Sequence, residues 1–404
     1  MTGPRGTAGG PLISVILAVH GVEEYLPGCL DSILSQPEPP GGLEVIAVDD
    51  ASPDGCGAIL DARAAADPRL RVLHLPRAAG PGPARMRGLA EAAGAHVWFA
   101  DPDDLLAEGS LAAVAGRLDR DRPDVLLLDY RILRPGGGSE PSPGTGLLAG
   151  PGGVITLADR PALIDRTMTL WSKVFRRSFV TALGVPLPPG IHEDVPLSAT
   201  ALLRAGRIAL LDQVCYLYRR RPGSFLATAS MEHFGIFTSY ARVFAALDRG
   251  ADAGPAVRAA VFGRMLEHYS SILASGLVPG PARRRFFARM AADFRRYRPP
   301  GYRRPPGFRG LKTALISRGA YRAYAMLAPA NNARVIARRA LSRRADRRRH
   351  PPRPGTGGRG RPPGSIAGTW SYPHESRSGH VVFSAVTEQS GDEGLMGQCD
   401  TSSG

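Results

Sequence analysis

Short apolar runs alternate with helical patterns through the first hundred residues, and this order limits the folds that the chain can adopt. The apolar runs cover residues 13–19, 43–48, 70–75 and 97–100. The helical patterns between them cover residues 23–35, 57–66 and 84–93. Strands that are apolar along their whole length are typical of parallel sheets with helices on both faces. The order therefore predicts an α/β, Rossmann-like fold with a mostly parallel central sheet.

The remaining sequence changes character near residue 231. Before that point we expect a strand at residues 124–128, a Gly- and Pro-rich loop at 135–153, and helices at 167–179 and 195–203. After it, helical patterns follow without strands, at residues 231–247, 256–274, 282–297 and 311–327. We predict four regions: a disordered N-terminus (1–11), an α/β domain (12–230), a smaller helical module (231–350) and a disordered Pro- and Gly-rich tail (351–404).

Positive charge is concentrated in the helical module. Residues 283–350 contain 21 Lys and Arg against two acids, a net charge of +19, so the rest of the 404-residue chain carries −4. Such a segment suits an anionic partner, either nucleic acid or the surface of an anionic membrane. We favour peripheral contact with a membrane and expect no nucleic acid partner.

Cysteine usage and hydropathy bear on the compartment. The four cysteines are widely spaced and form no CxxC pair, which indicates neither a disulfide framework nor a zinc site. The apolar run at 13–19 is too short to span a bilayer, and no other run is longer. We therefore expect a cytoplasmic protein that can also lie peripherally at the inner face of the cell membrane.

Carboxylates stand where two of the predicted strands end. They are Asp49 and Asp50 after residues 43–48, and Asp101, Asp103 and Asp104 after residues 97–100. In an open parallel sheet, both strand ends face one crevice, where ligands bind. Carboxylates there suit a hard divalent cation, or accept hydrogen bonds from a nucleotide base or ribose. The alternative is that residues 49–54 form only a turn and a helix cap.

The order of three segments resembles a known enzyme family. The segments are ISVILAVHGVEEYLPGCLDSIL, LEVIAVDDASPDG and ARMRGLAEAAGAHVWFADPDDLL. They are similar to the amino-terminal half of the inverting family 2 glycosyltransferases with a GT-A fold, over roughly residues 12–230. Enzymes that build bacterial cell-surface polymers, including teichoic-acid types, are the nearest in pattern. The resemblance implies transfer of a sugar from a nucleotide-sugar, UDP- or dTDP-linked, to a hydroxyl of a cell-envelope glycan, polymer or lipid-linked acceptor.

The resemblance also assigns roles to the carboxylates. Asp50, with Asp49 beside it, would contact the nucleotide base. Asp101 and Asp103 would be the DxD pair that binds Mn²⁺ or Mg²⁺ on the donor diphosphate, with Asp104 as an alternative ligand. A divalent cation there stabilises the negative charge that develops on the leaving nucleoside diphosphate.

A second motif supplies the candidate base. Glu193 and Asp194 resemble the Glu-Asp motif of the family, so Asp194 would deprotonate the acceptor hydroxyl with Glu193 supporting it. The alternative is that both acids only complement the dipole of the following helix. Arg85 matches the family's Ala-Arg-Asn run, in which it would meet phosphate, but here Met86 replaces the asparagine.

Further contacts to the donor are implied by two weaker matches. Trp171 would line the sugar pocket and Lys173 would face phosphate, although a tryptophan in an apolar stripe also suits a core. Arg219, Arg221 and Ser224 stand in a Tyr-Arg-Gly-Ser-like run that would approach the diphosphate.

Other nucleotide-dependent classes lack their motifs. Residues 20–24 read His-Gly-Val-Glu-Glu where a dinucleotide-binding enzyme needs GxGxxG, and the sequence contains no P-loop. The alternative from another class is a non-catalytic, basic protein that binds nucleic acid or membrane and retains a degenerate nucleotide-binding domain.

Overall fold

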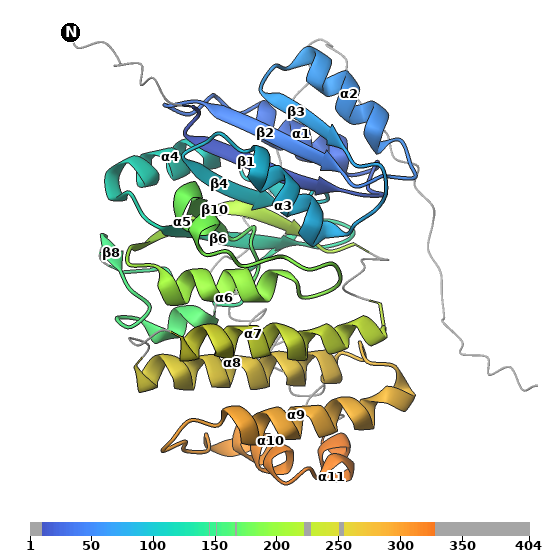
Figure 1. Cartoon of the computed structure of the whole chain (residues 1–404), viewed down its shortest axis with the longest axis vertical. Helices are drawn as coiled ribbons and strands as arrows, with labels where there is room; N and C mark the ends of the chain where they lie inside the picture. The colour runs from blue at the N-terminus through green and yellow to red at the C-terminus, as the bar shows by residue number, and fades with distance from the viewer. Residues whose placement is uncertain are drawn as a thin grey trace, which may run out of the picture. The chain divides into compact units, whose positions relative to one another are not determined.

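The computed structural model describes residues 10–144, 146–150, 152–165, 168–221, 228–249 and 254–327, all within one compact unit (Figure 1). These residues contain a ten-stranded sheet with the order β3-β2-β1-β4-β9-β6-β10-β5, on which β7 pairs with β6 and β8 with β10. The strands are β1 (Ile13–Val19), β2 (Leu43–Asp49), β3 (Leu70–His74), β4 (His96–Ala100), β5 (Leu105–Leu106), β6 (Val125–Leu133), β7 (Ser139–Pro141), β8 (Val154–Ile155), β9 (Lys173–Arg176) and β10 (Ile208–Arg219).

Most of the sheet runs in one direction. β1 pairs in parallel with β2 and β4, β2 with β3, and β6 with β10. β9 lies antiparallel between β4 and β6, so β6 runs the same way as β4. The short strands β5, β7 and β8 pair antiparallel with β10 or β6. The predicted mostly parallel α/β sheet is confirmed, and the carboxyl ends of β2 and β4 lie at one edge.

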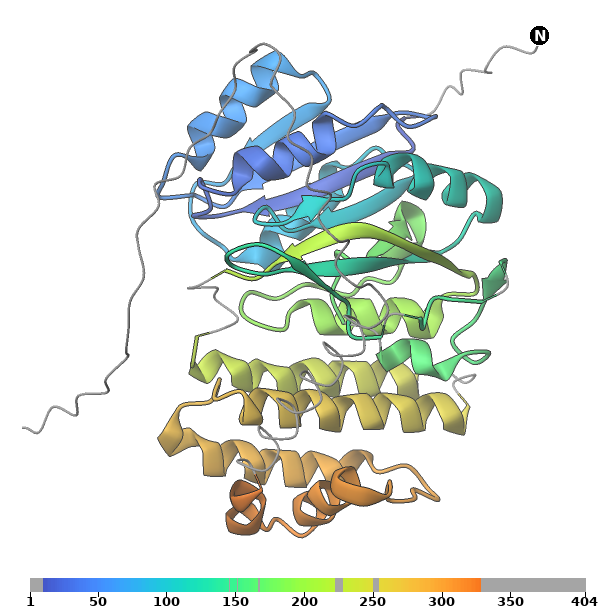
Figure 2. The same cartoon turned by 180° about the vertical axis from the view of Figure 1, so that it is seen from behind.

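Helices cover both faces because successive strand side chains point to opposite sides. Val15 and Leu17 of β1 pack with α1 (Leu26–Leu34), α2 (Cys56–Ala66) and α4 (Ser110–Asp121). Ile16 packs on the other face with α3 (Pro81–Glu91), α5 (Arg177–Ala182) and α6 (Asp194–Arg204). Figure 2 shows the sheet between these two layers from behind.

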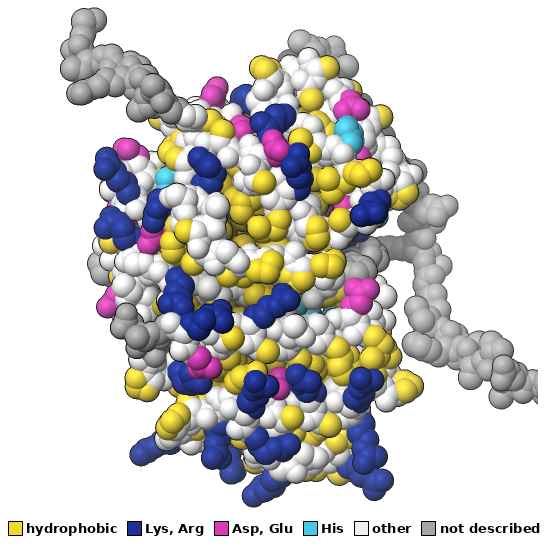
Figure 3. Space-filling view, viewed as in Figure 1, with side chains coloured by type: hydrophobic (Ala, Val, Ile, Leu, Met, Phe, Trp, Pro, Cys, Tyr) yellow, Lys and Arg dark blue, Asp and Glu magenta, His cyan; other side chains and the backbone are white. Residues whose placement is uncertain are grey.

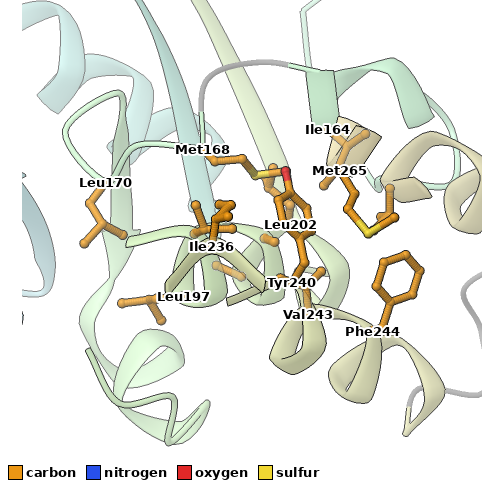
Figure 4. Packing of buried hydrophobic residues seen from close by; sticks show 14 of the residues in the cluster. Ile164, Met168, Leu170, Leu197, Leu202, Ile236, Tyr240, Val243, Phe244 and Met265 are labelled. Atoms are coloured by element: carbon orange, nitrogen blue, oxygen red, sulfur yellow. The ribbon is translucent and has the colours of Figure 1, made fainter. Parts of the chain in front are cut away.

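Further helices stack beyond α6, as Figure 1 shows. They are α7 (Gly235–Asp248), preceded by the 3₁₀ turn η3 (Met231–Phe234), then α8 (Pro255–Ala274), α9 (Arg283–Tyr297), α10 (Gly307–Ser317) and α11 (Tyr321–Met326). One hydrophobic cluster runs from the sheet face through α6 into these helices, and Figure 4 shows Leu197 and Leu202 of α6 beside Ile236 and Tyr240 of α7. The boundary near residue 231 stays a prediction. Among the described helices, none has the length and apolar character needed to cross a bilayer.

Three expectations about local structure are wrong. The helix expected at 167–179 is instead the strand β9 followed by α5, because Val174 and Phe175 are buried on opposite faces between β4 and β6. The loop expected at 135–153 contains β7. The single helix expected at 311–327 is split into α10 and α11 at Gly319, whose φ of 67° is left-handed and ends a helix.

Candidate active site

Asp50 fixes the loop that leads into α3. Its two carboxylate oxygens accept hydrogen bonds from the backbone N–H groups of Ala79 and Gly80, at 2.7 and 2.8 Å. Gly80, with a φ of 94°, precedes α3, whose first residue is Pro81. A carboxylate that accepts two backbone N–H bonds is held firmly. Asp50 therefore ties the end of β2 to the start of the helix that carries Arg85.

Asp49 is the last residue of β2 and lies beside His74 of the neighbouring strand β3. Its carboxylate accepts a hydrogen bond from the Ser52 backbone N–H at 3.0 Å and contacts His74 Nδ1 at 3.0 Å. Burial favours a raised pKa for Asp49, but the hydrogen bonds from Ser52 and His74 outweigh it, so the pKa is lowered. Asp49 is thus a charged group at physiological pH. His74 in turn reaches Asp61 on α2 at 2.9 Å.

The first turn of α3 lies against the segment that precedes the Glu-Asp motif. A Cβ atom added to Gly82 would stand 2.3 Å from the carbonyl oxygen of Pro188 and 2.6 Å from that of Leu187. Only a residue without a side chain allows this approach. The contact brings two segments about a hundred residues apart in the sequence to the same point.

Arg85 joins the two acidic motifs. Its Nη2 donates to Asp101 Oδ1 at 2.7 Å and its Nη1 donates to Glu193 Oε1 at 2.5 Å. The guanidinium side chain is only 11% exposed. Burial alone lowers the pKa of an arginine. The negative charges of Asp101 and Glu193 outweigh this effect and raise the pKa of Arg85 above its usual value, so the side chain is charged. The loop after β4 and the start of α6 therefore meet at one cation.

Asp194 begins α6 beside this ion pair. No hydrogen bond engages its carboxylate within the described part of the chain, in contrast to Glu193. Burial, followed by the charge of Glu193, raises the pKa of Asp194 to about 8, against the opposing effect of Arg85. A carboxylate with a raised pKa and no fixed partner suits a proton acceptor.

Asp103 and Asp104 differ in how many of their carboxylate oxygens are hydrogen-bonded. Asp103 Oδ2 accepts a hydrogen bond from Arg221 Nε at 2.7 Å, and its side chain is 21% exposed. Both oxygens of Asp104 are engaged: Oδ1 by the backbone N–H of Arg219 at 2.6 Å, and Oδ2 by the hydroxyl of Tyr216 at 2.9 Å. Asp104 is almost fully buried, so it holds β10 to the loop after β4.

The remaining sequence candidates fall into two groups. Trp171 stacks on Tyr216 and Tyr218 with interplanar angles of 11°, and is buried. Lys173 is fully buried, and its Nζ donates to the Thr169 carbonyl at 2.6 Å. Their roles toward the donor stay predictions.

The other group stands at the end of β10 and directly after it in the sequence, and comprises Arg219, Arg221 and Ser224. The guanidinium groups of Arg219 and Arg221 lie over the ring of Tyr25, at 5.1 and 5.3 Å from its centre. Ser224 lies outside the described residues. Tyr25 and Tyr216 were missed by the sequence analysis, since a lone tyrosine before a helix or inside an unrecognised strand carries no distinctive spacing.

Residues 14–145 match the family model described as Glycosyl transferase family 2. Over this stretch, the chain has the sequence pattern of a family 2 glycosyltransferase domain. A solved structure of Staphylococcus aureus TarS 1-349 in complex with UDP-GlcNAc matches with a TM-score of 0.64 at 20% identity, covering 79% of this chain and 91% of that one. The fold is therefore the GT-A fold.

Curated relatives are similar over about half of this chain. Bacillus subtilis EpsJ, an uncharacterized glycosyltransferase, is 27% identical over 53% of this chain and 62% of its own length. The succinoglycan biosynthesis protein ExoO of Rhizobium meliloti is 29% identical over 55% and 65%. Staphylococcus aureus TarS, a poly(ribitol-phosphate) beta-N-acetylglucosaminyltransferase, is 28% identical over 54% and 37%. The chain thus spans less than two thirds of each of these relatives.

Gly82→Ala tests the close approach of α3 to residues 187–188 in the glycosyltransferase domain. We expect the free energy of unfolding to fall by about 1–3 kcal/mol, because the added methyl group must displace backbone rather than a flexible side chain. Denaturant unfolding measures this. Gly116→Ala on the exposed side of α4 is the matched control, where nothing lies near the added Cβ and a gain of about 0.5–1 kcal/mol is expected. Equal effects at both positions would contradict the contact.

Asp194→Asn tests the electrostatic cost of the candidate base. A raised carboxyl pKa means that the folded state keeps its proton above the pH at which the unfolded state loses it, so stability is lost as pH rises from about 4 to 8. The variant should gain about 2–4 kcal/mol at pH 8.5 and almost nothing near pH 4. Denaturant unfolding at both pH values measures the difference. Asp212→Asn, the same substitution at an exposed position of β10, is the matched control.

Proposed function

We propose that this protein is an inverting glycosyltransferase that moves a sugar from a nucleotide-sugar to a hydroxyl group of a cell-envelope glycan, polymer or lipid-linked acceptor. The observation that carries the proposal is the pair of hydrogen bonds by which Arg85 joins Asp101 to Glu193. Through it, the carboxylates suited to a cation and the candidate base Asp194 share one edge of the sheet. Transfer requires this proximity, because the donor diphosphate and the acceptor hydroxyl lie on opposite sides of the reacting carbon.

Asp101 and Asp103 are the proposed holders of Mn²⁺ or Mg²⁺. Their side chains are 25% and 21% exposed, and each has one carboxylate oxygen outside its hydrogen bond to an arginine. Carboxylate oxygens are the ligands that hard divalent cations prefer. Among the described residues no set of three His, Cys, Asp or Glu side chains forms a complete cation cluster, so phosphate oxygens and water would fill the remaining positions. Asp104 is the weakest candidate of the three because both of its carboxylate oxygens already accept hydrogen bonds.

The bound cation would supply Lewis-acid stabilisation of the leaving diphosphate. Arg85, Arg219 and Arg221 add fixed or nearby positive charge at the same edge. Asp50 and Asp49, at the end of β2, are the proposed contacts to the nucleotide base. Both carboxylates already have hydrogen bonds, Asp50 from the N–H groups of Ala79 and Gly80 and Asp49 from Ser52 and His74, so a base N–H would add to these contacts.

Asp194 is the proposed general base and Glu193 its support. The Glu193 carboxylate is fixed by Arg85, whereas Asp194 has no such bond among the described residues. Before it can accept the acceptor proton, Asp194 must be ionised, and positive charge brought in with the donor favours that form. Attack by the activated hydroxyl opposite the leaving diphosphate inverts the configuration of the anomeric carbon.

The comparisons support the class of donor and acceptor. TarS is seen in complex with UDP-GlcNAc, and the names of TarS and ExoO refer to poly(ribitol-phosphate) and to succinoglycan. We propose a UDP- or dTDP-sugar as donor and an envelope polymer or its lipid-linked precursor as acceptor. A hydroxyl in either acceptor satisfies the chemistry.

The helical module supports a peripheral position at the inner face of the membrane. Figure 3 shows Lys and Arg side chains gathered on the helices at the end remote from β3. The exposed arginines among residues 283–327 are Arg284, Arg285, Arg289, Arg295, Arg296, Arg298, Arg303, Arg304, Arg309, Arg318 and Arg322. The single acid among residues 283–327 is Asp293, which is buried and bonded to Tyr269. Such a surface attracts anionic lipid.

Two variants separate the donor site from the base. Asp103→Asn should lose the Mn²⁺-dependent part of the affinity for UDP-GlcNAc or a dTDP-sugar, by tenfold or more, because a charged ligand of the cation is removed. Asp194→Asn should bind the donor within about threefold of the parent and lower kcat by about 10²–10⁴. Calorimetric titration and a transfer assay measure the two effects. Asp212→Asn is the control. Unchanged transfer in Asp194→Asn would remove it as the base.

Vesicle flotation of the full chain tests the membrane surface. Binding to vesicles with 30% phosphatidylglycerol should exceed binding to neutral vesicles, and Arg295→Glu with Arg296→Glu should weaken it at least tenfold, at about 1 kcal/mol per charge near the surface. Arg120→Glu with Arg122→Glu, the same charge change on α4 and at its end, should have little effect. Equal binding to neutral vesicles would contradict the proposal, and tighter binding to DNA at physiological salt would favour the nucleic-acid alternative.

A further inference from the structure

Three histidines, of which His192 and His233 are buried and His268 is partly buried, form a cluster that begins beside the candidate base. His192 precedes Glu193 and Asp194, His233 belongs to η3, and His268 belongs to α8. His192 Nε2 lies 3.2 Å from His233 Nδ1, and the ring of His268 stands edge-on to that of His192 with their centres 5.1 Å apart. The sequence analysis did not find this cluster, because its members are separated by 41 and 35 residues.

The hydrogen bonds link two of these rings to the backbone. His233 Nε2 lies 3.1 Å from the carbonyl oxygen of Thr228, which can only accept, so Nε2 carries a proton. His192 Nε2 and His233 Nδ1, 3.2 Å apart, share one further proton, whichever of the two nitrogens carries it. A chain of two hydrogen bonds therefore runs from Thr228 through His233 to His192.

The surroundings disfavour a positive charge on His192 and His268. Among the described residues no carboxylate forms an ion pair with any of the three histidines. Arg264 of α8 is the cation whose charge acts on His268, and the Tyr240 hydroxyl of α7 lies 3.3 Å from His268 Nδ1. The nearby acids Asp165, Asp194 and Glu267 act on Tyr240. Burial, then the neighbouring His233, lowers the pKa of His192 to about 3.

The backbone at His192 needs this support. Its φ is 67°, in the left-handed region that residues other than glycine seldom adopt. The His192 carbonyl accepts a hydrogen bond from Ser239 Oγ of α7 at 2.9 Å, and its ring is held by His233. The turn that aims Glu193 and Asp194 is therefore clamped from both its backbone and its side chain by residues 228–239.

We propose that His192 and His233 are positioning residues, which set the place of Asp194 at the sheet edge through a hydrogen-bonded pair of imidazoles. This inference rests on the proposed function, because it assigns the pair to the geometry of the base. The clamp acts on the base and leaves the donor site at Asp49 and Asp103 unchanged. Loss of the clamp should thus lower kcat and spare donor affinity.

Histidine-selective ¹⁵N NMR of the full chain tests the pair without any assay of transfer. At pH 7 the spectrum should show a coupling across a hydrogen bond between His192 Nε2 and His233 Nδ1. Two rings that share no proton would overturn the inference.

Substitution of His233 tests the consequence for transfer. His233→Leu should lower kcat at least tenfold and leave the donor Kd within twofold, whereas His233→Asn, whose side-chain oxygen can replace Nδ1 as acceptor, should recover most of kcat. His96→Asn is the matched control, a buried histidine at the amino end of β4 whose loss should lower stability without changing kcat.

The outcomes separate the two proposals. An active parent protein whose kcat is unchanged in His233→Leu would overturn the positioning role alone. A parent protein that transfers no sugar from any donor would overturn the proposed function, while the NMR result still decides the state of the histidines. Should His233→Leu fail to fold, His233→Asn and the NMR spectrum carry the test.

Discussion

The ion pairs of Arg85 are the interaction on which the candidate site depends. A buried guanidinium needs partners, and breaking one of its pairs costs about 3–5 kcal/mol because the other charges stay buried. Asp101 and Glu193 meet this need from loops that β4 and α6 place at one edge. Arg85 reaches both because Asp50 fixes the start of α3 and Gly82 admits residues 187–188. Four separate segments are thus arranged around one side chain.

The same close packing places several buried or partly buried carboxylates next to one another. Burial raises the pKa of Asp101, Glu193 and Asp194, with Arg85 opposing the rise in each. A folded protein gains nothing from such repulsion, and perturbed carboxylates of this kind gather at functional sites. A divalent cation beside Asp101 and Asp103 would stabilise their charged forms and relieve the repulsion. The electrostatic cost in the free protein is therefore consistent with a site built for a charged donor.

The sequence predicted the acidic strand ends and missed what holds them. The runs before Asp50 and Asp101 are apolar throughout, so strand direction alone placed both carboxylates at one edge. The strand β10 was missed because Asp212 and Gln213 interrupt its apolar pattern at an irregular register. Without it, Tyr216 could not be recognised as the partner of Asp104. Side-chain bonds across the fold leave no periodic signal in the chain, whereas buried strands do.

The position of the base depends on helices that lie beyond the sheet domain in sequence. Asp194 opens α6, and α6 packs against the sheet on one side and α7 on the other. The left-handed backbone at His192 costs about 1–3 kcal/mol, which only surrounding contacts can offset. Those contacts come from Ser239 and His233, both beyond residue 231. A chain that ended at residue 230 would keep every acidic motif and lose the constraint that aims the base. The helical layers therefore belong to the geometry of the proposed transfer.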